Sequence, residues 1–311
     1  MSSAGNADAL SATWETLAGE TDVGTVLTTS SASAATRASR DATVRVIEPG
    51  RPVPFRELWE ARDLLYFLTW RDVKVRYTQS LIGMGWAVVQ PLLMMGLITV
   101  VLGVLARVPR PDGVPYALFV LAGLVPWTFF ANAVTSASDS LVRSANLVGK
   151  VYFPRLIIPV SSMLAWVPDL GVALVLLLVA MVGFGVLPGW AALATPVFIA
   201  LALLAAASVG TWVAALNVAY RDVKYVVPFA LQLGLFATPV VYPADLVPEA
   251  YRVLYGLNPM VGVVEGFRWT LLGQAAPDGA MVAASVAAVL IVLFTGLRYF
   301  RKVERYFADV I

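Results

Sequence analysis

Three basic residues at short spacing mark the place where the sequence changes from charged to apolar. Arg71, Lys74 and Arg76 form this basic collar within the segment RDVKVRY, and no ionisable residue occurs between Leu81 and Leu105. Side chains of this kind can bind phosphate groups as point or fork charges. Their position beside an apolar run also indicates the cytoplasmic side of a membrane, and simple anchoring in lipid headgroups is the alternative role.

The composition removes most kinds of catalysis. The sequence has no cysteine and no histidine, so it offers no thiolate nucleophile, no imidazole base and no disulfide. It lacks a phosphate-binding loop of the GxxxxGK(S/T) form, since Gly149-Lys150 has no glycine at the required place upstream. We therefore expect that the chain is not an enzyme, that it binds no cofactor or metal, and that a separate subunit hydrolyses any ATP.

The bulk composition is that of an integral membrane protein. Of the 311 residues, 59% are hydrophobic and 14% are charged, whereas soluble domains have about 25% charged residues. The mean hydropathy is +0.78, and roughly 20 apolar residues suffice for a helix to cross a bilayer. The sequence predicts an all-α membrane protein with six transmembrane helices, at 81–105, 116–134, 156–187, 191–217, 226–242 and 281–297.

Basic residues near the ends of the predicted spans are distributed unevenly between the two sides. Twelve lie on the side of the basic collar and four on the other side. Because cytoplasmic loops carry the excess of Lys and Arg, both termini are predicted to be cytoplasmic. The net charge of +2 says little by itself, because the side on which the charges lie is what matters in a membrane protein, and no nucleic-acid partner is implied.

The segments outside the spans are of three kinds. Residues 1–54 are rich in Ser, Thr and Ala and are predicted to form a disordered cytoplasmic tail. Residues 55–70 carry apolar and charged residues at helical spacing, which predicts an amphipathic helix on the membrane surface. Residues 243–279 contain two short amphipathic pieces separated by Asn258-Pro259. Neither piece is long enough to span, so the region predicts re-entrant external helices buried against protein.

Charged residues within apolar stretches need partners. Glu265 and Arg268 are three residues apart and can pair on one helical face. Asp169 stands inside the third predicted span, where an aspartate costs on the order of 2.5 to 3.5 kcal/mol, so it should face protein or water. It could cap the helix after Pro168 or take part in a proton relay.

Three stretches resemble one family. They are RDVKVRYTQSLIGMGWAVVQPLL at 71–93, NLVGKVYFPR at 146–155, and LNPM followed by E and FR at 257–268. They resemble the membrane subunit of bacterial ABC-2 type polysaccharide exporters, which move O-antigen, teichoic acid and related lipid-linked glycans. The resemblance covers residues 55–311 as one transmembrane domain and leaves the N-terminal tail unexplained.

This resemblance implies a homodimer that works with two copies of an ABC ATPase subunit in the bacterial cytoplasmic (inner) membrane. ATP and magnesium would be bound by the partner subunit. The residues implied in coupling to the ATPase are Asn146, Lys150, Tyr152, Phe153 and Arg155. The residues implied in an external gate are Asn258, Pro259, Glu265 and Arg268.

The predicted function is ATP-driven export of a polysaccharide carried on polyprenyl diphosphate. The basic collar would bind the diphosphate, and sugars would slide along aromatic faces. These aromatic residues are Trp86, Trp127, Phe129, Phe130 and Phe236. One alternative is an ABC-2 exporter of a small lipid or drug. Another is a membrane enzyme acting on polyprenyl phosphates, which needs clustered acids, whereas Asp112 and Asp222 stand alone.

Overall fold

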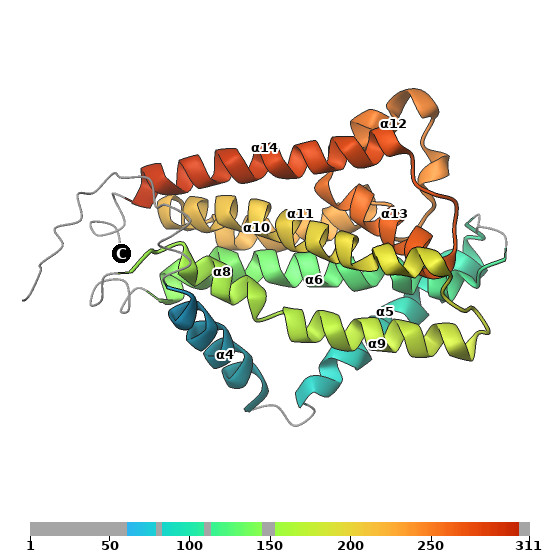
Figure 1. Cartoon of the computed structure of the whole chain (residues 1–311), viewed down its shortest axis with the longest axis horizontal. Coiled ribbons are helices and arrows are strands. Elements are labelled where there is room, and N and C mark those ends of the chain that lie inside the picture. Colours follow the sequence, from blue (N-terminus) through green and yellow to red (C-terminus); the bar gives the residue numbers. More distant parts are fainter. Residues whose placement is uncertain (1–60, 79–82, 109–112, 145–152, 305–311) are drawn as a thin grey trace, which may run out of the picture. The chain divides into compact units, whose positions relative to one another are not determined.

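The computed structural model describes residues 61–78, 83–108, 113–144 and 153–304, and every regular element in these ranges is helical (Figure 1). The main helices are α4 (Arg62–Thr78), α5 (Trp86–Ile98), α6 (Tyr116–Arg143), α8 (Ile157–Leu164), α9 (Val167–Gly183), α10 (Thr195–Ala219), α11 (Val223–Ala237), α12 (Glu249–Tyr255), α13 (Pro259–Leu272) and α14 (Gly279–Glu304). The short helical segments are η1 (Gly83–Gly85), η2 (Thr99–Leu105), η3 (Trp190–Ala194) and η4 (Ala244–Leu246). The predicted tail at 1–54 lies outside the described residues.

Five helical segments in the described part of the chain are long and apolar enough to cross a membrane. They are Trp86–Leu105, Tyr116–Arg143, Ile157–Gly183, Trp190–Ala219 and Gly279–Glu304. Helix α11 is apolar but has 15 residues, fewer than a span requires. The prediction of an all-α membrane protein is thus confirmed, with a short helix at the place of the fifth predicted span.

Helix α4 is inclined to the long helices in Figure 1 and ends later than predicted. The surface helix was expected to end at residue 70, but it continues through the basic collar to Thr78. The sequence has no glycine or proline in this stretch to end it, and the next glycine, Gly83, has a positive φ of 55°. Its buried residues are Leu68 and Val73, and α8 is the helix that it packs against.

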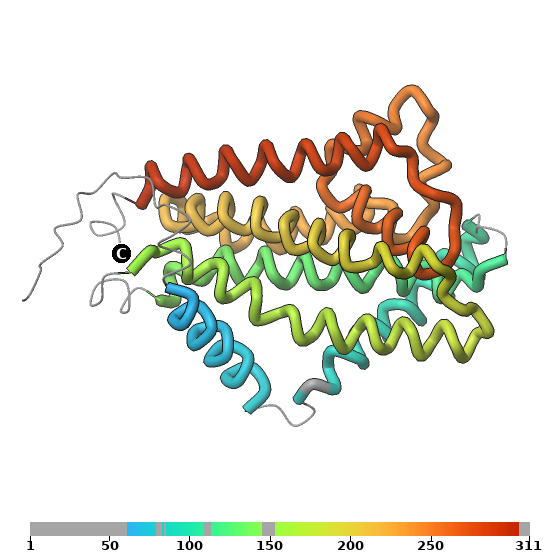
Figure 2. Tube along the Cα trace, viewed as in Figure 1, coloured from blue at the N-terminus to red at the C-terminus, as the bar shows by residue number. Residues whose placement is uncertain are grey.

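Helix α6 is the central helix of the bundle (Figure 2), and it packs against α5, α8, α9, α10, α11 and α13. Its predicted end at residue 134 is corrected by the structure, because the polar residues that follow continue the helix to Arg143. None of them is glycine or proline, and Ala137, Ser138 and Leu141 extend its buried surface. Pro126 lies within the helix without ending it.

The third predicted span is two helices. Helix α8 ends at Leu164, and α9 begins at Val167 with Pro168 in its first turn. A proline is tolerated there because the first amide groups of a helix have no intrahelical partner. The break between the two helices lies just before Pro168, whereas Pro159 lies within α8. The break places Asp169 in the first turn of α9.

The last helices also differ from their predicted bounds. Helix α11 ends at Ala237 instead of residue 242, and residues 238–243 form no helix. Helix α14 extends past the predicted residue 297 to Glu304. Between them, α12 has no buried residue, whereas α13 is buried for most of its length and packs against α6, α10 and α14. The prediction of short helices buried against protein therefore holds for α13 only.

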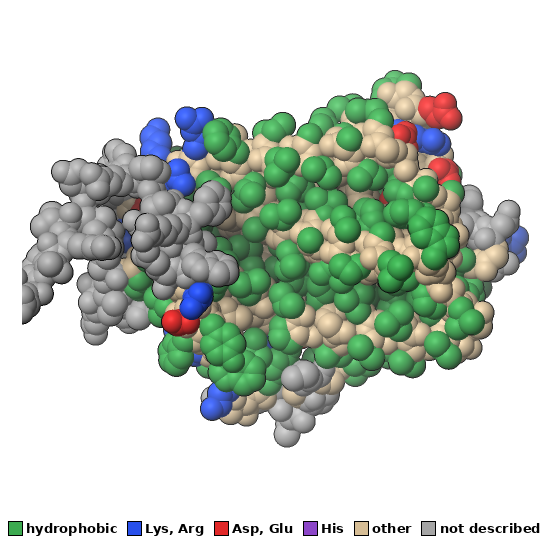
Figure 3. Space-filling view, in the orientation of Figure 1, with side chains coloured by type: hydrophobic (Ala, Val, Ile, Leu, Met, Phe, Trp, Pro, Cys, Tyr) green, Lys and Arg blue, Asp and Glu red, His purple; other side chains and the backbone are tan. Residues whose placement is uncertain are grey.

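Side-chain types are segregated on the face seen in Figure 3. Hydrophobic side chains cover the middle of the helices, and charged side chains gather towards the end of α14 and around α12. Many large apolar side chains of the described helices are exposed, among them Leu93 and Leu97 of α5 and Phe229 and Leu233 of α11. Such a surface is stable in a lipid bilayer.

Candidate functional site

Two adjoining cavities lie between the helices. The larger, of about 540 Å³, lies between α5, α6 and α11 and is called the groove below. The smaller, of about 150 Å³, lies between the end of α4 and the helices α5, α6 and α9 and is called the chamber. Trp86, Gln90, Thr128 and Asn132 line both cavities, so the groove and the chamber share a wall.

The groove carries three primary amides on three different apolar helices. Gln90 lies on α5, Asn132 on α6 and Gln232 on α11. None of these side chains forms a hydrogen bond with another residue in the described ranges. An amide without a partner in an apolar environment costs free energy, so this arrangement favours a groove filled with water or a polar ligand. These amides are not among the predicted site residues, although a primary amide within an apolar run of sequence itself indicates a polar site inside the membrane.

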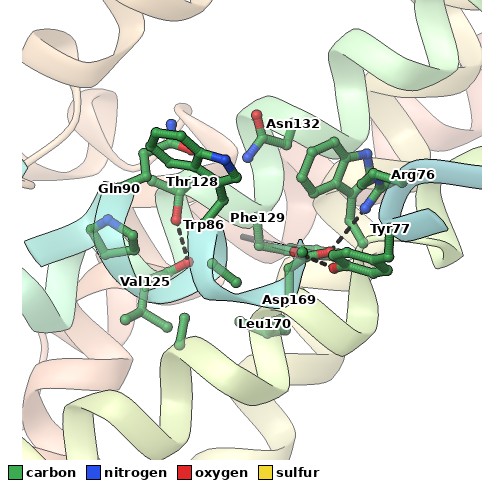
Figure 4. Close-up of a pocket in the computed structure, with 15 residues that line it drawn as sticks. Arg76, Tyr77, Trp86, Gln90, Val125, Thr128, Phe129, Asn132, Asp169 and Leu170 are labelled. Atoms are coloured by element: carbon green, nitrogen blue, oxygen red, sulfur yellow. Dashed lines mark hydrogen bonds and ion pairs between the residues drawn. The ribbon is translucent and has the colours of Figure 1, made fainter. Parts of the chain in front are cut away.

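The chamber contains an ion pair that joins α4 to α9 (Figure 4). The Nη1 atom of Arg76 lies 2.9 Å from Oδ2 of Asp169, and the Tyr77 hydroxyl donates to Oδ1 of Asp169 at 2.6 Å. Nη1 of Arg76 also donates to the carbonyl of Ala165 at 3.1 Å. The guanidinium carbon lies 3.5 Å from the centre of the Trp166 ring. Arg76 thus ties the end of α4 to the break between α8 and α9.

The surroundings of Tyr77 keep its hydroxyl protonated. Burial and the hydrogen bond to Asp169 raise the pKa of Tyr77 to about 12, so its hydroxyl keeps its proton and donates at neutral pH. Asp169 lies in the first turn of α9, where the helix dipole stabilises a carboxylate. Its carboxylate serves Arg76 and Tyr77 rather than acting as the predicted helix cap.

The basic collar does not form one cluster. Arg71 pairs with its neighbour Asp72 at 2.8 Å on the exposed side of α4. Lys74 is exposed and has no acidic partner among the described residues. Arg76 points into the chamber. Of the three cations predicted to bind phosphate, Lys74 is therefore the one whose charge is uncompensated in the described ranges.

The predicted aromatic residues are spread over different environments. Trp127, Phe129 and Phe130 are buried, whereas Trp86 is 51% exposed and Phe236 is 58% exposed. Trp86 lines both cavities, Trp127 lines the groove and Phe129 lines the chamber. Phe130 packs on Trp127 with ring centroids 5.6 Å apart, and neither Phe130 nor Phe236 lines the groove or the chamber.

The described part of the predicted coupling segment is anchored to the bundle. Phe153 is buried in a second apolar cluster with residues of α6, α8, α10 and α14. Nη1 of Arg155 donates to the carbonyl of Glu304 at the end of α14 at 2.7 Å. Asn146, Lys150 and Tyr152 lie outside the described residues.

The predicted gate residues belong to α13 and its first turn. Asn258 caps α13 by accepting a hydrogen bond from the Met260 amide at 3.0 Å, and Pro259 is the first residue of the helix. Asn258 also donates to the Thr238 hydroxyl at 2.8 Å. The predicted pair of Glu265 and Arg268 is confirmed at 2.8 Å.

Arg268 connects three parts of the bundle. Its side chain is 1% exposed, and Nη2 donates to the Val240 carbonyl at 2.7 Å, in the non-helical stretch after α11. Its guanidinium carbon lies 3.5 Å from the centre of the Phe119 ring on α6. The Tyr116 hydroxyl donates to the next carbonyl of the same stretch, that of Val241, at 2.6 Å. Side chains thus satisfy backbone carbonyls that a longer α11 would have paired within the helix.

The fold and these cavities define a helical membrane protein in which polar side chains line internal cavities and large apolar side chains cover much of the outer surface. The sequence profile of the ABC-2 type transporter family matches residues 63–272, and the chain belongs to this family. The O-antigen export system permease protein RfbA of Myxococcus xanthus is 29% identical over 258 residues, which cover 82% of this chain and 98% of that protein.

Other relatives are similar over nearly their whole length. The O-antigen export system permease protein RfbA of Klebsiella pneumoniae is 26% identical over 80% of this chain and 95% of that protein. The polysialic acid transport protein KpsM of Escherichia coli is 21% identical over 75% of this chain and 91% of that protein. The matches cover the helices that form the groove and the chamber.

Proposed function

We propose that this chain is the transmembrane subunit of an ATP-driven exporter that moves a polysaccharide linked to polyprenyl diphosphate. The observation that carries this proposal is the groove, whose wall has two tryptophans, Trp86 and Trp127, and three amides that are unpaired within the described ranges. The names of the relatives, which are O-antigen and polysialic acid transport proteins, support the same substrate class.

The chemistry of the groove suits sugars better than lipid tails. Amide groups donate and accept hydrogen bonds without charge, as sugar hydroxyls require, and aromatic faces contact the apolar faces of pyranose rings. A conduit for alkyl chains would leave the three amides unpaired in an apolar environment, at a cost of about 1 to 3 kcal/mol each. The groove therefore favours a glycan over a small lipid.

The lipid diphosphate is assigned to the exposed side of α4. Lys74 and Arg71 lie there, and Arg76 follows at the mouth of the chamber. A diphosphate would compete with Asp72 for Arg71 and would find Lys74 without an acidic partner among the described residues. The glycan attached to it would then extend into the groove.

A second copy of the chain completes the path in this proposal. The groove is open along α5 and α11, and both helices present exposed apolar side chains beside it, such as Leu93 and Phe229. A two-fold axis beside these helices would place two grooves face to face. The ATPase, with ATP and magnesium, is a separate subunit that binds the coupling segment at the inner membrane, where both termini of the chain lie.

Coupling and gating follow from the contacts of the two ends of the bundle. A push on the coupling segment would reach α14 through Arg155 and the core through Phe153. At the other end, the gate residues Asn258, Pro259, Glu265 and Arg268 hold α13 against the unwound end of α11. Helix α12, which precedes α13, has no buried side chain.

The test is the ATPase activity of the chain co-purified with its ABC ATPase subunit in lipid nanodiscs. Activity is compared for polyprenyl diphosphate with a long glycan, for the same carrier without sugar, and for lipid alone. We expect stimulation by the long glycan, which the double variant Gln90→Ala/Gln232→Ala reduces and the exterior control Trp190→Ala does not. Equal stimulation by the sugar-free carrier would identify a lipid exporter, and absence of any complex with an ATPase would contradict the transporter assignment.

A further inference from the structure

We propose that the chamber is a recognition site for one neutral pyranose ring, distinct from the groove through which the glycan slides. This inference rests on the proposed function, because it takes a glycan to be the substrate. It assigns to Arg76, Asp169 and Asn132 the selection of a particular sugar.

The size of the chamber fits a single ring. Its volume of about 150 Å³ corresponds to about five water molecules in the liquid, each of which occupies roughly 30 Å³. The groove beside it is several times larger. Since the two cavities share the wall formed by Trp86, Gln90, Thr128 and Asn132, a sugar of a chain in the groove can enter the chamber while its neighbours stay in the groove.

The chamber offers hydrogen-bonding groups that are fixed in position. The Arg76 guanidinium is held by Asp169, by the Ala165 carbonyl and by the Trp166 ring, and all of these bonds use the Nη1 atom or the face of the group. Its remaining N–H groups and the free lone pairs of the Asp169 carboxylate are available to hydroxyls of a ligand. The groups need no rearrangement to receive such a ligand, which lowers the entropic cost of binding.

The remaining walls complete a site for a sugar. The Asn132 amide, which has no hydrogen-bond partner within the described ranges, borders the chamber and provides both a donor and an acceptor (Figure 4). Trp86 is half exposed and borders the same space, so its ring face is available to the apolar face of a pyranose. These groups together match one pyranose ring. The amide and the carboxylate–guanidinium pair can bind its vicinal hydroxyls, and the aromatic ring can contact its C–H face.

The charges favour a neutral sugar over a phosphate. Asp169 lies in direct contact with Arg76 and compensates its charge, and a phosphate bound there would be repelled by the carboxylate. Lys74, two residues before Arg76 on the exposed side of α4, lacks an acidic partner in the described part of the chain and suits a phosphate better. The chamber and the exposed side of α4 thus divide the substrate between them, with the sugar in the chamber and the diphosphate outside it.

The test measures sugar binding by saturation-transfer difference NMR, on the complex of this chain with its ATPase in lipid nanodiscs. The probes are a panel of methyl pyranosides that differ in the configuration of single hydroxyls, with inorganic pyrophosphate as a competitor. The variants are Asn132→Ala, which removes a side chain without internal bonds, and Asp169→Asn, which keeps the shape of the chamber. Trp190→Ala is the exterior control.

We expect a signal from a subset of the pyranosides, weakened about fivefold or more in affinity by Asn132→Ala, as the loss of one or two hydrogen bonds predicts. The signal should persist in Trp190→Ala and in the presence of pyrophosphate. A thermal unfolding curve of Asp169→Asn shows whether that variant is folded, and Asn132→Ala provides the test if it is not.

Three results would overturn the proposal. One is the absence of a signal from every pyranoside at tens of millimolar. Another is a signal that Asn132→Ala leaves unchanged, and the third is displacement by pyrophosphate, which would make the chamber a phosphate site. These results are independent of the test of the proposed function, since glycan-stimulated ATPase activity with no sugar in the chamber would reject only the recognition site. Sugar binding without stimulation would reject the exporter instead.

Discussion

The bundle contains two arginines that are bound in nearly the same way but differ in their access to a cavity. Arg76 and Arg268 each pair through Nη1 with a carboxylate, at 2.9 and 2.8 Å, and each lies 3.5 Å from an aromatic ring centre. Each also donates to backbone carbonyls at an interrupted helix, at the break between α8 and α9 or after α11. The Arg76 side chain is 25% exposed and borders the chamber, whereas Arg268 is 1% exposed.

This difference separates a structural role from a binding role. Arg268 is 1% exposed and borders neither the groove nor the chamber, so its contacts hold α13, α6 and the end of α11 together. Arg76 makes the same kinds of contact but keeps N–H groups towards the chamber. A guanidinium within a membrane bundle is therefore not by itself a substrate site, and its exposure to a cavity decides between the two roles.

The largest effect is expected for Arg268→Ala. The substitution leaves Glu265 without its partner and the Val240 carbonyl without its donor. Breaking a buried ion pair in this way costs about 3 to 5 kcal/mol. Thermal unfolding of the detergent-purified protein should show a large fall in stability, and the yield of purified protein should fall as well. Arg252→Ala, which removes longer and exposed ion pairs on α12, is the matched control and should have little effect.

The next largest effect is expected for Gly123→Ala on α6. A methyl group there would lie 2.9 Å from the Val240 carbonyl oxygen and 3.2 Å from Nη2 of Arg268, so it would push apart the contact that the arginine makes. We expect a destabilisation of about 1 to 3 kcal/mol, as for other overpacked sites. The control is Gly171→Ala on α9, where an added methyl group meets no atom within 4 Å. Equal unfolding temperatures for the two variants would show that the contact between Arg268 and the Val240 carbonyl is not tightly packed against α6.

A smaller loss of stability, with a change in function, is expected for Asp169→Asn. The pair with Arg76 is partly exposed, and an asparagine can still accept one hydrogen bond, so the loss should be about 1 kcal/mol. Stimulation of ATPase activity by glycan should fall more than stability does. Tyr77→Phe removes the second bond to Asp169 and should lower stimulation in the same direction. Stability and stimulation that fall in proportion would indicate that the Arg76–Asp169 pair is structural, as the Glu265–Arg268 pair is.

The smallest effect on stability is expected for Lys74→Ala. This side chain has no acidic partner in the described ranges, so unfolding should change by less than about 0.5 kcal/mol. Half-maximal stimulation should need more lipid-linked glycan, and the difference from the unchanged protein should shrink at high salt, because salt screens exposed charges. Titrations at low and high ionic strength measure this. If Lys74→Ala raised the half-maximal concentration by the same factor at both ionic strengths, this would argue against a diphosphate contact at Lys74.

Local patterns predicted the contacts that depend on neighbouring residues in the chain. The pairing of Glu265 with Arg268 follows from their spacing of three residues within one helix. The interruption near Pro168 follows from the backbone of proline. The ends of helices are predicted less well. The polar residues after position 134 predict the end of a span, but α6 continues to Arg143 because these residues favour a helix and have a surface to bury against α10.

The candidate site depended on contacts between distant parts of the chain. Arg76 and Asp169 are separated by 93 positions, and no periodicity within one helix indicates that they meet. The amides Gln90, Asn132 and Gln232 come together only because α5, α6 and α11 pack side by side. The same packing separates the aromatic residues that the sequence grouped, since Trp127 faces the groove and Phe129 the chamber.

The sequence by itself determined the class of protein, because apolar length and the scarcity of charge set which segments can exist in a bilayer. It also determined the family, through motifs that span most of the chain. Only the tertiary structure decided which arginine is closed off and which faces a cavity. That property depends on the relative positions of helices, which are set by side-chain packing over the whole bundle and not by the residues beside each arginine.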